Sequence, residues 1–380
     1  MEYLDFRITM TGSDQEGKHT VLIESPAGGF TGEFVNPFAK DDLDKRLIQG
    51  RLQVRSLEET RSEEALQDIG PIDSTNDLEE IGNELSRALF QDQVMSAYAE
   101  SKGIVAGSGE GLRIRIRIDP GMEEYAELMS LPWEFLYDEA ANVRIELVPN
   151  RAIVRDPITP TPRDVLTMTR PLRVLVAISD PQDYPPLKLG REMLSLSKVA
   201  EIPGIEVKFL EKATIRRLND EMGQKEYHVF HFMGHGGIVN EKTVLVFKGE
   251  DDNGYPIDGE GLRLALSDSI RLVFLNACET ARIPEADPFA SIPTELGKGG
   301  IPAIVAMQFP ISDSAAIRFC VKFYSSIATG LPVDQAMGEA RKEIFFGVDT
   351  RPEWGTPVLF MNSPDGTLFD IEEEPQSEST

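Results

Sequence analysis

Cysteine and histidine are scarce in this chain. Its 380 residues include two cysteines, Cys278 and Cys320, and four histidines. Two cysteines argue against the disulfide framework of a secreted protein and fit a reducing compartment, in which a thiol can serve as a nucleophile. So few cysteines and histidines also argue against a dedicated zinc site. We therefore expect no metal and no other cofactor.

Basic residues are outnumbered, with 38 lysines and arginines against 64 aspartates and glutamates, which gives a formal net charge of −26. Such a charge repels phosphate backbones and anionic lipids unless basic side chains gather in a patch. Arg113, Arg115 and Arg117 alternate with apolar residues. This alternation predicts a strand with one solvated face and not a nucleic-acid footprint. We expect no direct nucleic-acid partner.

Long hydrophobic runs are also missing. No apolar stretch approaches the length that crosses a bilayer, and Met1 is followed by Glu2 and Asp5 instead of a basic and then apolar secretion signal. These features predict a cytoplasmic protein that has no membrane partner.

Proline marks the clearest change along the chain. Four prolines between positions 157 and 171 punctuate a polar stretch, residues 156–171, which has the composition of a linker. We expect this linker to separate an N-terminal mixed α+β region, residues 1–155, from a second domain at residues 172–370. Residues 371–380 form an acidic tail with the composition of a disordered segment.

The N-terminal region mixes strand and helix patterns. We expect strands at Tyr3–Met10, Thr20–Glu24 and Leu112–Ile118, and a charged helical stretch at Leu78–Ser101. The region carries no recognisable chemistry. It either receives an activating partner or completes the fold, and we favour the second role.

The second domain consists of short apolar runs separated by amphipathic segments, which predicts an α/β fold with a largely parallel sheet. Because the runs are apolar on both faces, helices must cover both sides of the sheet. The expected strands are Leu172–Ile178, Ile205–Phe209, Tyr227–Met233, Arg271–Asn276, Ala303–Met307 and Val358–Met361. The expected helices are Arg191–Ala200, Ile215–Met222, Gly259–Leu266, Ser314–Thr329 and Val333–Phe345. Cys320 lies on the apolar face of its helix, so we expect a buried core thiol.

One histidine follows an expected strand. The run Tyr227–Met233 is followed by a Gly-His-Gly-Gly sequence that contains His235, and its glycines permit a tight, exposed turn. His235 therefore lies at the carboxyl end of a strand, the edge where catalytic groups collect in open α/β sheets. His228 and His231 lie inside the strand, where we expect packed or hydrogen-bonded core residues.

Cys278 occupies the equivalent position after the strand Arg271–Asn276, so the two side chains can meet at one edge of the sheet. The residues between them leave room for a hairpin at Thr243–Ile257. A neighbouring imidazole favours ionisation of a thiol and can later protonate a leaving amine. The backbone N–H groups of Gly236 and Cys278 are suited to bind an oxyanion. On these residues alone, a packed cysteine and a surface histidine are an equally good interpretation.

Three motifs occur in order along the second domain. They are His-Gly after one strand, Asn-Ala-Cys-Glu-Thr after the next, and Ala-Met-Gln-Phe-Pro-Ile-Ser-Asp at residues 306–313. Together they resemble the CHAT peptidases, which are grouped with caspases, gingipains and separases, over about residues 172–361. The resemblance implies a caspase-like, mostly parallel six-stranded sheet flanked by helices, a dyad of His235 and Cys278, an oxyanion donor at Gly236, and endoproteolysis of a protein substrate.

A further segment, Leu-Pro-Trp-Glu-Phe-Leu-Tyr-Asp at residues 131–138, resembles one that often precedes such domains in bacterial proteins. Its Trp133 is expected to be a core anchor, because aromatic residues in apolar runs usually pack.

Two residues bear on substrate and processing. Asp313 lies where the resemblance to separases implies an acidic residue at the floor of the specificity pocket, which would select Arg or Lys. Ser312 and Asp313 also directly precede an amphipathic helix, so either could be its N-cap. The polar loop after Cys278 is of the kind that is readily nicked, and self-cleavage at Arg282 is a further hypothesis.

The chain contains neither a recognisable helical repeat array nor a nucleotide-binding loop. Because proteases of the family usually answer to a sensor, the resemblance implies a protein activator or a proteolytic activating step. By analogy alone it suggests a bacterial defence, such as antiviral defence, or a cell-death pathway. Two alternatives stay open: a non-catalytic scaffold with the caspase fold, and a thiol acyltransferase or small-amide hydrolase.

Overall fold

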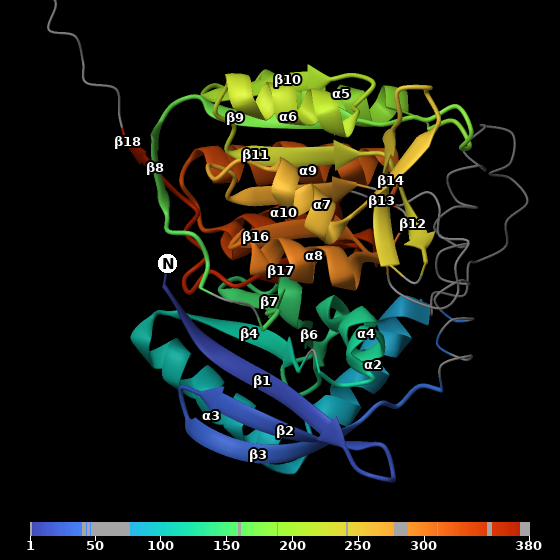
Figure 1. Cartoon of the computed structure of the whole chain (residues 1–380). Coiled ribbons are helices and arrows are strands. Elements are labelled where there is room, and N and C mark those ends of the chain that lie inside the picture. The colour runs from blue at the N-terminus through green and yellow to red at the C-terminus, as the bar shows by residue number, and fades with distance from the viewer. Residues whose placement is uncertain are drawn as a thin grey trace, which may run out of the picture.

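The computed structural model describes residues 2–39, 43, 46, 77–119, 121–158, 161–187, 189–240, 242–276, 288–309, 311–347 and 352–372. Among these residues a single large sheet runs through the molecule (Figure 1). From one edge to the other its eleven strands are β10 (Ile205–Leu210), β9 (Leu172–Ile178), β11 (Val229–Met233), β15 (Leu272–Asn276), β16 (Ala303–Met307), β17 (Pro357–Met361), β7 (Arg151–Arg155), β4 (Gly111–Ile118), β1 (Tyr3–Ser13), β2 (Lys18–Ser25) and β3 (Gly28–Val35).

The first six of these strands are the six that the sequence predicts for the second domain. β10, β9, β11, β15 and β16 are parallel to their neighbours, and β17 is antiparallel to β16. The five residues of β9 that pair with β11 are buried, and so are all residues of β11 and β16. The apolar composition of these strands requires this burial. The predicted α/β fold with a mostly parallel six-stranded sheet is therefore confirmed.

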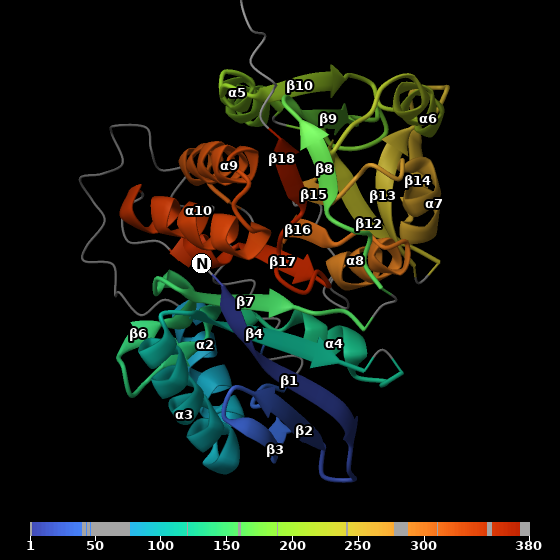
Figure 2. The ribbon, with the colours of Figure 1, turned by 90° about the vertical axis from the view of Figure 1, so that its left-hand side faces the viewer.

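Helices cover both faces of this part of the sheet, as predicted (Figure 2). One layer consists of α5 (Leu189–Ala200), α9 (Asp313–Ala328) and α10 (Val333–Gly347), in which α9 contacts both of the other helices. The opposite layer consists of α6 (Ile215–Gln224), α7 (Gly259–Ala265) and α8 (Pro288–Lys298). Cys320 of α9 is buried in the apolar cluster under the first layer, which confirms its predicted core position.

The sheet continues into the N-terminal region. β17 pairs in parallel with β7 through Phe360 and Arg155, and β7 pairs with β4. The expected strands of this region correspond to β1, β2 and β4, and the expected helical stretch corresponds to α2 (Asp77–Leu89) and α3 (Asp92–Ser108). The predicted linker includes β8 (Leu166–Thr169), which pairs with β18 (Phe369–Glu372). The domain boundaries at residues 155 and 172 stay a prediction.

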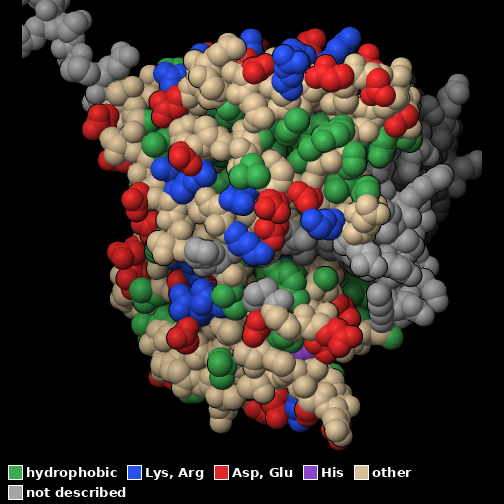
Figure 3. Space-filling view, in the orientation of Figure 1, with side chains coloured by type: hydrophobic (Ala, Val, Ile, Leu, Met, Phe, Trp, Pro, Cys, Tyr) green, Lys and Arg blue, Asp and Glu red, His purple; other side chains and the backbone are tan. Residues whose placement is uncertain are grey.

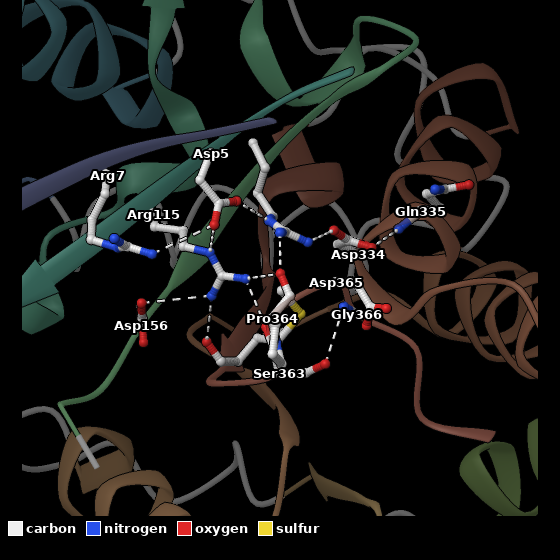
Figure 4. A network of polar contacts seen from close by, with 12 residues as sticks. Asp5, Arg7, Arg115, Asp156, Asp334, Gln335, Ser363, Pro364, Asp365 and Gly366 are labelled. Atoms are coloured by element: carbon white, nitrogen blue, oxygen red, sulfur yellow. Dashed lines mark hydrogen bonds and ion pairs between the residues drawn. The ribbon is translucent and has the colours of Figure 1, made fainter. Parts of the chain in front are cut away.

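The expectation of a solvated arginine face on β4 is wrong. Arg113 and Arg115 are each only 2% exposed, because α10 and the segment after β17 cover this face of the sheet. Arg113 and Arg115 donate to the two carboxylate oxygens of Asp5 at 2.7 and 2.8 Å, and Figure 4 shows Arg115 beside Asp5. Arg113 also donates to Asp334 of α10 at 2.9 Å. Buried guanidinium groups need such partners, and here they join the N-terminal region to α10.

A small antiparallel sheet projects from the end of β11. It consists of β12 (His235–Val239), β13 (Lys242–Lys248) and β14 (Gly254–Asp258), and it confirms the hairpin predicted at Thr243–Ile257. β12 begins with His235, so this sheet and the large one meet at that residue.

Two surface properties bear on the expected partners. In the face shown in Figure 3, acidic and basic side chains are interleaved. Within the described ranges, no helix has both the length and the apolar character needed to cross a membrane.

Candidate functional site

The carboxyl ends of three neighbouring strands are joined by backbone hydrogen bonds. Ser179, directly after β9, donates its N–H to the Met233 carbonyl at the end of β11, at 2.8 Å. Gly234 donates to the Asn276 carbonyl at the end of β15, at 3.3 Å. These bonds fix the starting points of the loops that leave the sheet at this edge, where catalytic groups of α/β proteins collect.

Gly234 fits here because it has no side chain. A Cβ atom at this position would lie 2.5 Å from the ring of Phe232 and 3.2 Å from the carbonyl oxygen of Ser179. Only glycine accommodates so close an approach. The chain can therefore turn directly from β11 into β12 and begin the new strand with His235.

His235 is more enclosed than the exposed turn that the sequence predicts. Its side chain is only 1% exposed, and in the ladder between β12 and β13 it lies opposite Val246. The ring of Tyr184 packs against the imidazole, with 5.2 Å between the ring centroids and 32° between their planes. Gly236, the predicted oxyanion donor, is the next residue of β12 and is also buried.

The register of the sheet relates His235 to the predicted nucleophile. Met233 and Asn276 are partners in the parallel ladder between β11 and β15. His235 follows the first of these residues by two positions, and Cys278 follows the second by two positions. Cys278 itself lies outside the described residues, as does Arg282, so their predicted roles stay predictions.

His231 of β11 and His228, the second residue of the predicted strand and directly before β11, are both core residues, as predicted. Nδ1 of His231 lies 2.8 Å from the hydroxyl of Tyr324, and its ring stacks on Phe274 with 4.4 Å between centroids. Nδ1 of His228 accepts a hydrogen bond from the backbone N–H of Arg173 at 3.1 Å. Burial disfavours the charged imidazolium and lowers the pKa of His231 from 6.5 to about 3. Burial, with the positive charges of Arg173 and Arg271, lowers the pKa of His228 to about 4.

Ser312, and not Asp313, is the N-cap of α9. The Ser312 hydroxyl accepts from the backbone N–H of Ala315 at 3.4 Å and donates to the carboxylate of Glu353 at 2.8 Å. Glu353 is buried, and it also accepts the backbone N–H of Ser312. Asp313 is the first residue of α9. Its proposed place in a specificity pocket stays a prediction.

A buried triad of side chains joins two of the sequence motifs. Arg155 of β7 forms two hydrogen bonds with the carboxylate of Glu134, at 3.0 and 2.7 Å. Gln308, directly after β16, accepts from Arg155 at 2.9 Å and donates to Glu134 at 3.0 Å. Both charged side chains are fully buried. The segment at residues 131–138 therefore braces the loop between β16 and α9, a role that the sequence did not reveal.

Trp133, next to Glu134, is fully buried and donates from Nε1 to the Leu128 carbonyl at 2.9 Å, as expected of a core anchor. Across the described part of the chain, no group of three or more histidine, cysteine, aspartate or glutamate side chains could hold a metal ion.

A family described as the CHAT domain matches residues 79–353 of this chain. No curated protein matches it. Two crystal structures of the Saccharomyces cerevisiae separase–securin complex are similar to it, each with a TM-score of 0.50 and 12% sequence identity over 97% of this chain and 30% of that chain. The crystal structure of the Arg-specific cysteine proteinase gingipain R is similar with a TM-score of 0.39 and 12% identity, over 72% of this chain and 76% of that chain.

This chain thus spans less than a third of the separase chain. At 12% identity the likeness to separase concerns the fold alone. The fold, with its mostly parallel central sheet flanked by helices, is similar to the caspase-like fold of separase.

Proposed function

This chain belongs to the CHAT domain family, and on that basis we propose that it is a cysteine endopeptidase in which His235 and Cys278 form the catalytic pair. The observation that supports the pair most strongly is the register of the sheet. Met233 and Asn276 are ladder partners, and the two proposed residues follow them at equal spacing on adjacent parallel strands. Loops that start side by side at one sheet edge can bring an imidazole and a thiol together.

The proposed chemistry needs only these two side chains and backbone donors. The imidazole of His235 takes the proton of the Cys278 thiol, and the thiolate attacks the scissile carbonyl carbon. The N–H groups of Gly236 and Cys278 bind the oxyanion of the tetrahedral intermediate. His235 then protonates the leaving amine, and water hydrolyses the acyl-enzyme to release the acid and restore the thiol.

We further propose that the enzyme cuts after Arg or Lys, with Asp313 in the pocket. β15 and β16 are parallel, so the loop from β16 to Asp313 leaves the same sheet edge as the loop that carries Cys278. A carboxylate that pairs with a guanidinium or ammonium group at this edge would select a basic residue before the cut.

A protein partner is also part of the proposal. The similar separase structures are complexes with securin, which is a property of that protein. For this chain we propose a protein substrate and activation by a protein partner or by a proteolytic step, in a defence or cell-death pathway. Self-cleavage at Arg282 is one such step. Intact-mass analysis of wild type beside Cys278→Ala tests it, and identical single species would rule it out.

Digestion of a proteome-derived peptide library tests the activity and the specificity together. Wild type is compared with Cys278→Ala and His235→Ala, while Cys320→Ala serves as the matched control because that thiol is buried in the core. We expect cuts after Arg and Lys by wild type and the control only. Cuts after other residues would support the peptidase activity but contradict the proposed role of Asp313 in specificity.

Two outcomes would favour the alternatives. Cysteine-dependent turnover of small amides or acyl donors without peptide cleavage would indicate an amidase or acyltransferase. Absence of cleavage, also after addition of candidate partner proteins, would indicate a non-catalytic scaffold.

A further inference from the structure

The loop after β9 covers the imidazole that the proposed function uses. Residues 179–187 leave the sheet next to β11, and Tyr184 lies within this loop. The Tyr184 ring is half-buried and packs against His235, which is itself nearly inaccessible to solvent. Tyr184 is therefore a direct neighbour of the proposed general base.

The loop is held in place by the turn between β13 and β14. Gln182 donates its backbone N–H to the Asp252 carbonyl at 3.0 Å. The carboxylate of Asp183 accepts the backbone N–H of Gly254 at 2.7 Å. Two successive residues, just before Tyr184, are thus bound to the same turn, and this restricts where the Tyr184 ring can lie.

The small sheet is shaped to receive the ring. A Cβ atom on Gly254 would lie 2.5 Å from Cε2 of Tyr184 and 2.8 Å from Val246. Val246 is the ladder partner of His235. The absence of a side chain at Gly254 therefore leaves the space in which Tyr184 reaches both the hairpin and the imidazole.

We propose that Tyr184 is a positioning residue that holds the His235 imidazole in the orientation needed for proton transfer. This inference rests on the proposed peptidase function. A tyrosine ring that packs against an imidazole restricts the rotation of the imidazole, as the tilted Tyr184 ring can do here. Catalysis depends on such placement, since a misplacement of about 1 Å can cost about 100-fold in rate.

Substitutions at Tyr184 distinguish the contribution of the ring from that of its hydroxyl group. Tyr184→Phe keeps the ring and is expected to retain nearly wild-type kcat. Tyr184→Leu removes it, and we expect kcat to fall about 10- to 100-fold with a small change in KM. The matched control is Tyr255→Leu on the same hairpin, because Tyr255 is 52% exposed and lies outside the proposed site. Loss of activity in Tyr184→Phe, or full kcat in Tyr184→Leu, would overturn the proposal.

A second pair of variants changes the hydrogen bond between Asp183 and Gly254, which anchors the loop, instead of the Tyr184 ring. Asp183→Asn keeps an oxygen acceptor for the Gly254 N–H, whereas Asp183→Ala removes it. We expect Asp183→Ala to lower kcat and Asp183→Asn to restore most of it. Equal activity in the two variants would show that the anchor does not act through Tyr184.

A measurement that does not need turnover tests the ring contact by itself. The measurement is NMR of protein that is isotopically labelled at the histidine imidazoles. The imidazole resonance of His235 is identified by its loss in His235→Gln. We expect this signal to shift in Tyr184→Leu, because the ring current of the tyrosine is removed, and to stay in place in Tyr255→Leu. An unchanged signal in Tyr184→Leu overturns the inference. If wild type cleaves no peptide while the signal still shifts, the peptidase proposal fails and the Tyr184–His235 contact stands.

Discussion

Gly234 sets the position of His235 through its lack of a side chain. In Gly234→Ala the added methyl group would lie 2.5 Å from the buried ring of Phe232, so the ring or the turn must shift. We expect unfolding to become easier by about 1–3 kcal/mol and peptidase activity to fall, because the displaced turn carries His235. Urea unfolding followed by tryptophan fluorescence measures the first effect.

The control for this variant is Gly237→Ala in β12, the strand that begins directly after Gly234. No atom lies within 4 Å of a Cβ built on Gly237, so the added methyl group is tolerated. Equal stability and activity of the two variants would show that space at Gly234 does not position the histidine.

The side chains of β11 show what the sequence can reveal at the scale of single residues. His231 of β11 and His228, directly before it, were predicted as core residues because an apolar run on both faces leaves no solvated position. For Arg113 and Arg115 the same kind of reasoning failed. An alternating strand looks identical whether its polar face meets water or a covering helix, and α10 is more than two hundred positions away in the chain.

The connection between β16 and α9 depends on a buried ion pair at the scale of elements. In Glu134→Gln the charge that balances Arg155 is lost, while the guanidinium group stays fully buried. We expect a loss of about 3–5 kcal/mol in the free energy of unfolding, because an uncompensated buried charge is costly. Urea unfolding measures this loss.

The matched control is Glu139→Gln, which removes the partner of Arg87 in an exposed pair. Surface pairs contribute about 0–1 kcal/mol, so little change is expected there. Because Gln308 contacts both buried side chains, Glu134→Gln is also expected to lower activity on peptides with a basic residue before the cut. Similar losses in the two variants would argue against the bracing role.

The elements themselves were largely predictable, whereas their long-range contacts were not. Apolar runs and amphipathic periods depend on neighbouring residues, so all six strands of the second domain could be read from the sequence. The Glu134–Gln308 contact joins segments far apart in the chain, and neither segment shows a pattern that names the other. The same holds for Tyr184, which lies in a loop without periodicity and reaches His235 only in three dimensions.

At the scale of the whole molecule, burial of neutral imidazoles makes stability depend on pH. The pKa of His231 is about 3 in the folded chain and near 6.5 when unfolded. Between these values the unfolded state binds one more proton, so the free energy of unfolding falls as the pH falls, by about 1.4 kcal/mol per pH unit for this group. His231→Gln should flatten the pH dependence of the urea midpoint between about pH 6.5 and pH 5.

Above about pH 7.5 the His231 imidazole is neutral in both the folded and the unfolded chain. The stabilities of wild type and His231→Gln should therefore depend on pH in parallel there. This range is the internal control, since the variant also loses the contact with Tyr324 at every pH. An unchanged slope at acid pH would show that His231 takes up a proton in the folded chain.

The N-terminal region completes the sheet and is expected to be required for folding. A chain that starts at residue 156 lacks β7, the parallel neighbour of β17, and so exposes the β17 edge. It also leaves two buried charges on α10 unpaired, Asp334 without Arg113 and Arg341 without Glu146. We expect this chain to show no cooperative unfolding transition and to aggregate in size-exclusion chromatography.

As the control, a chain that ends at residue 372 keeps every described strand and should unfold like the full chain. A soluble, cooperatively folding chain from residue 156 would instead establish the predicted boundary and make residues 1–155 a separate, regulatory unit.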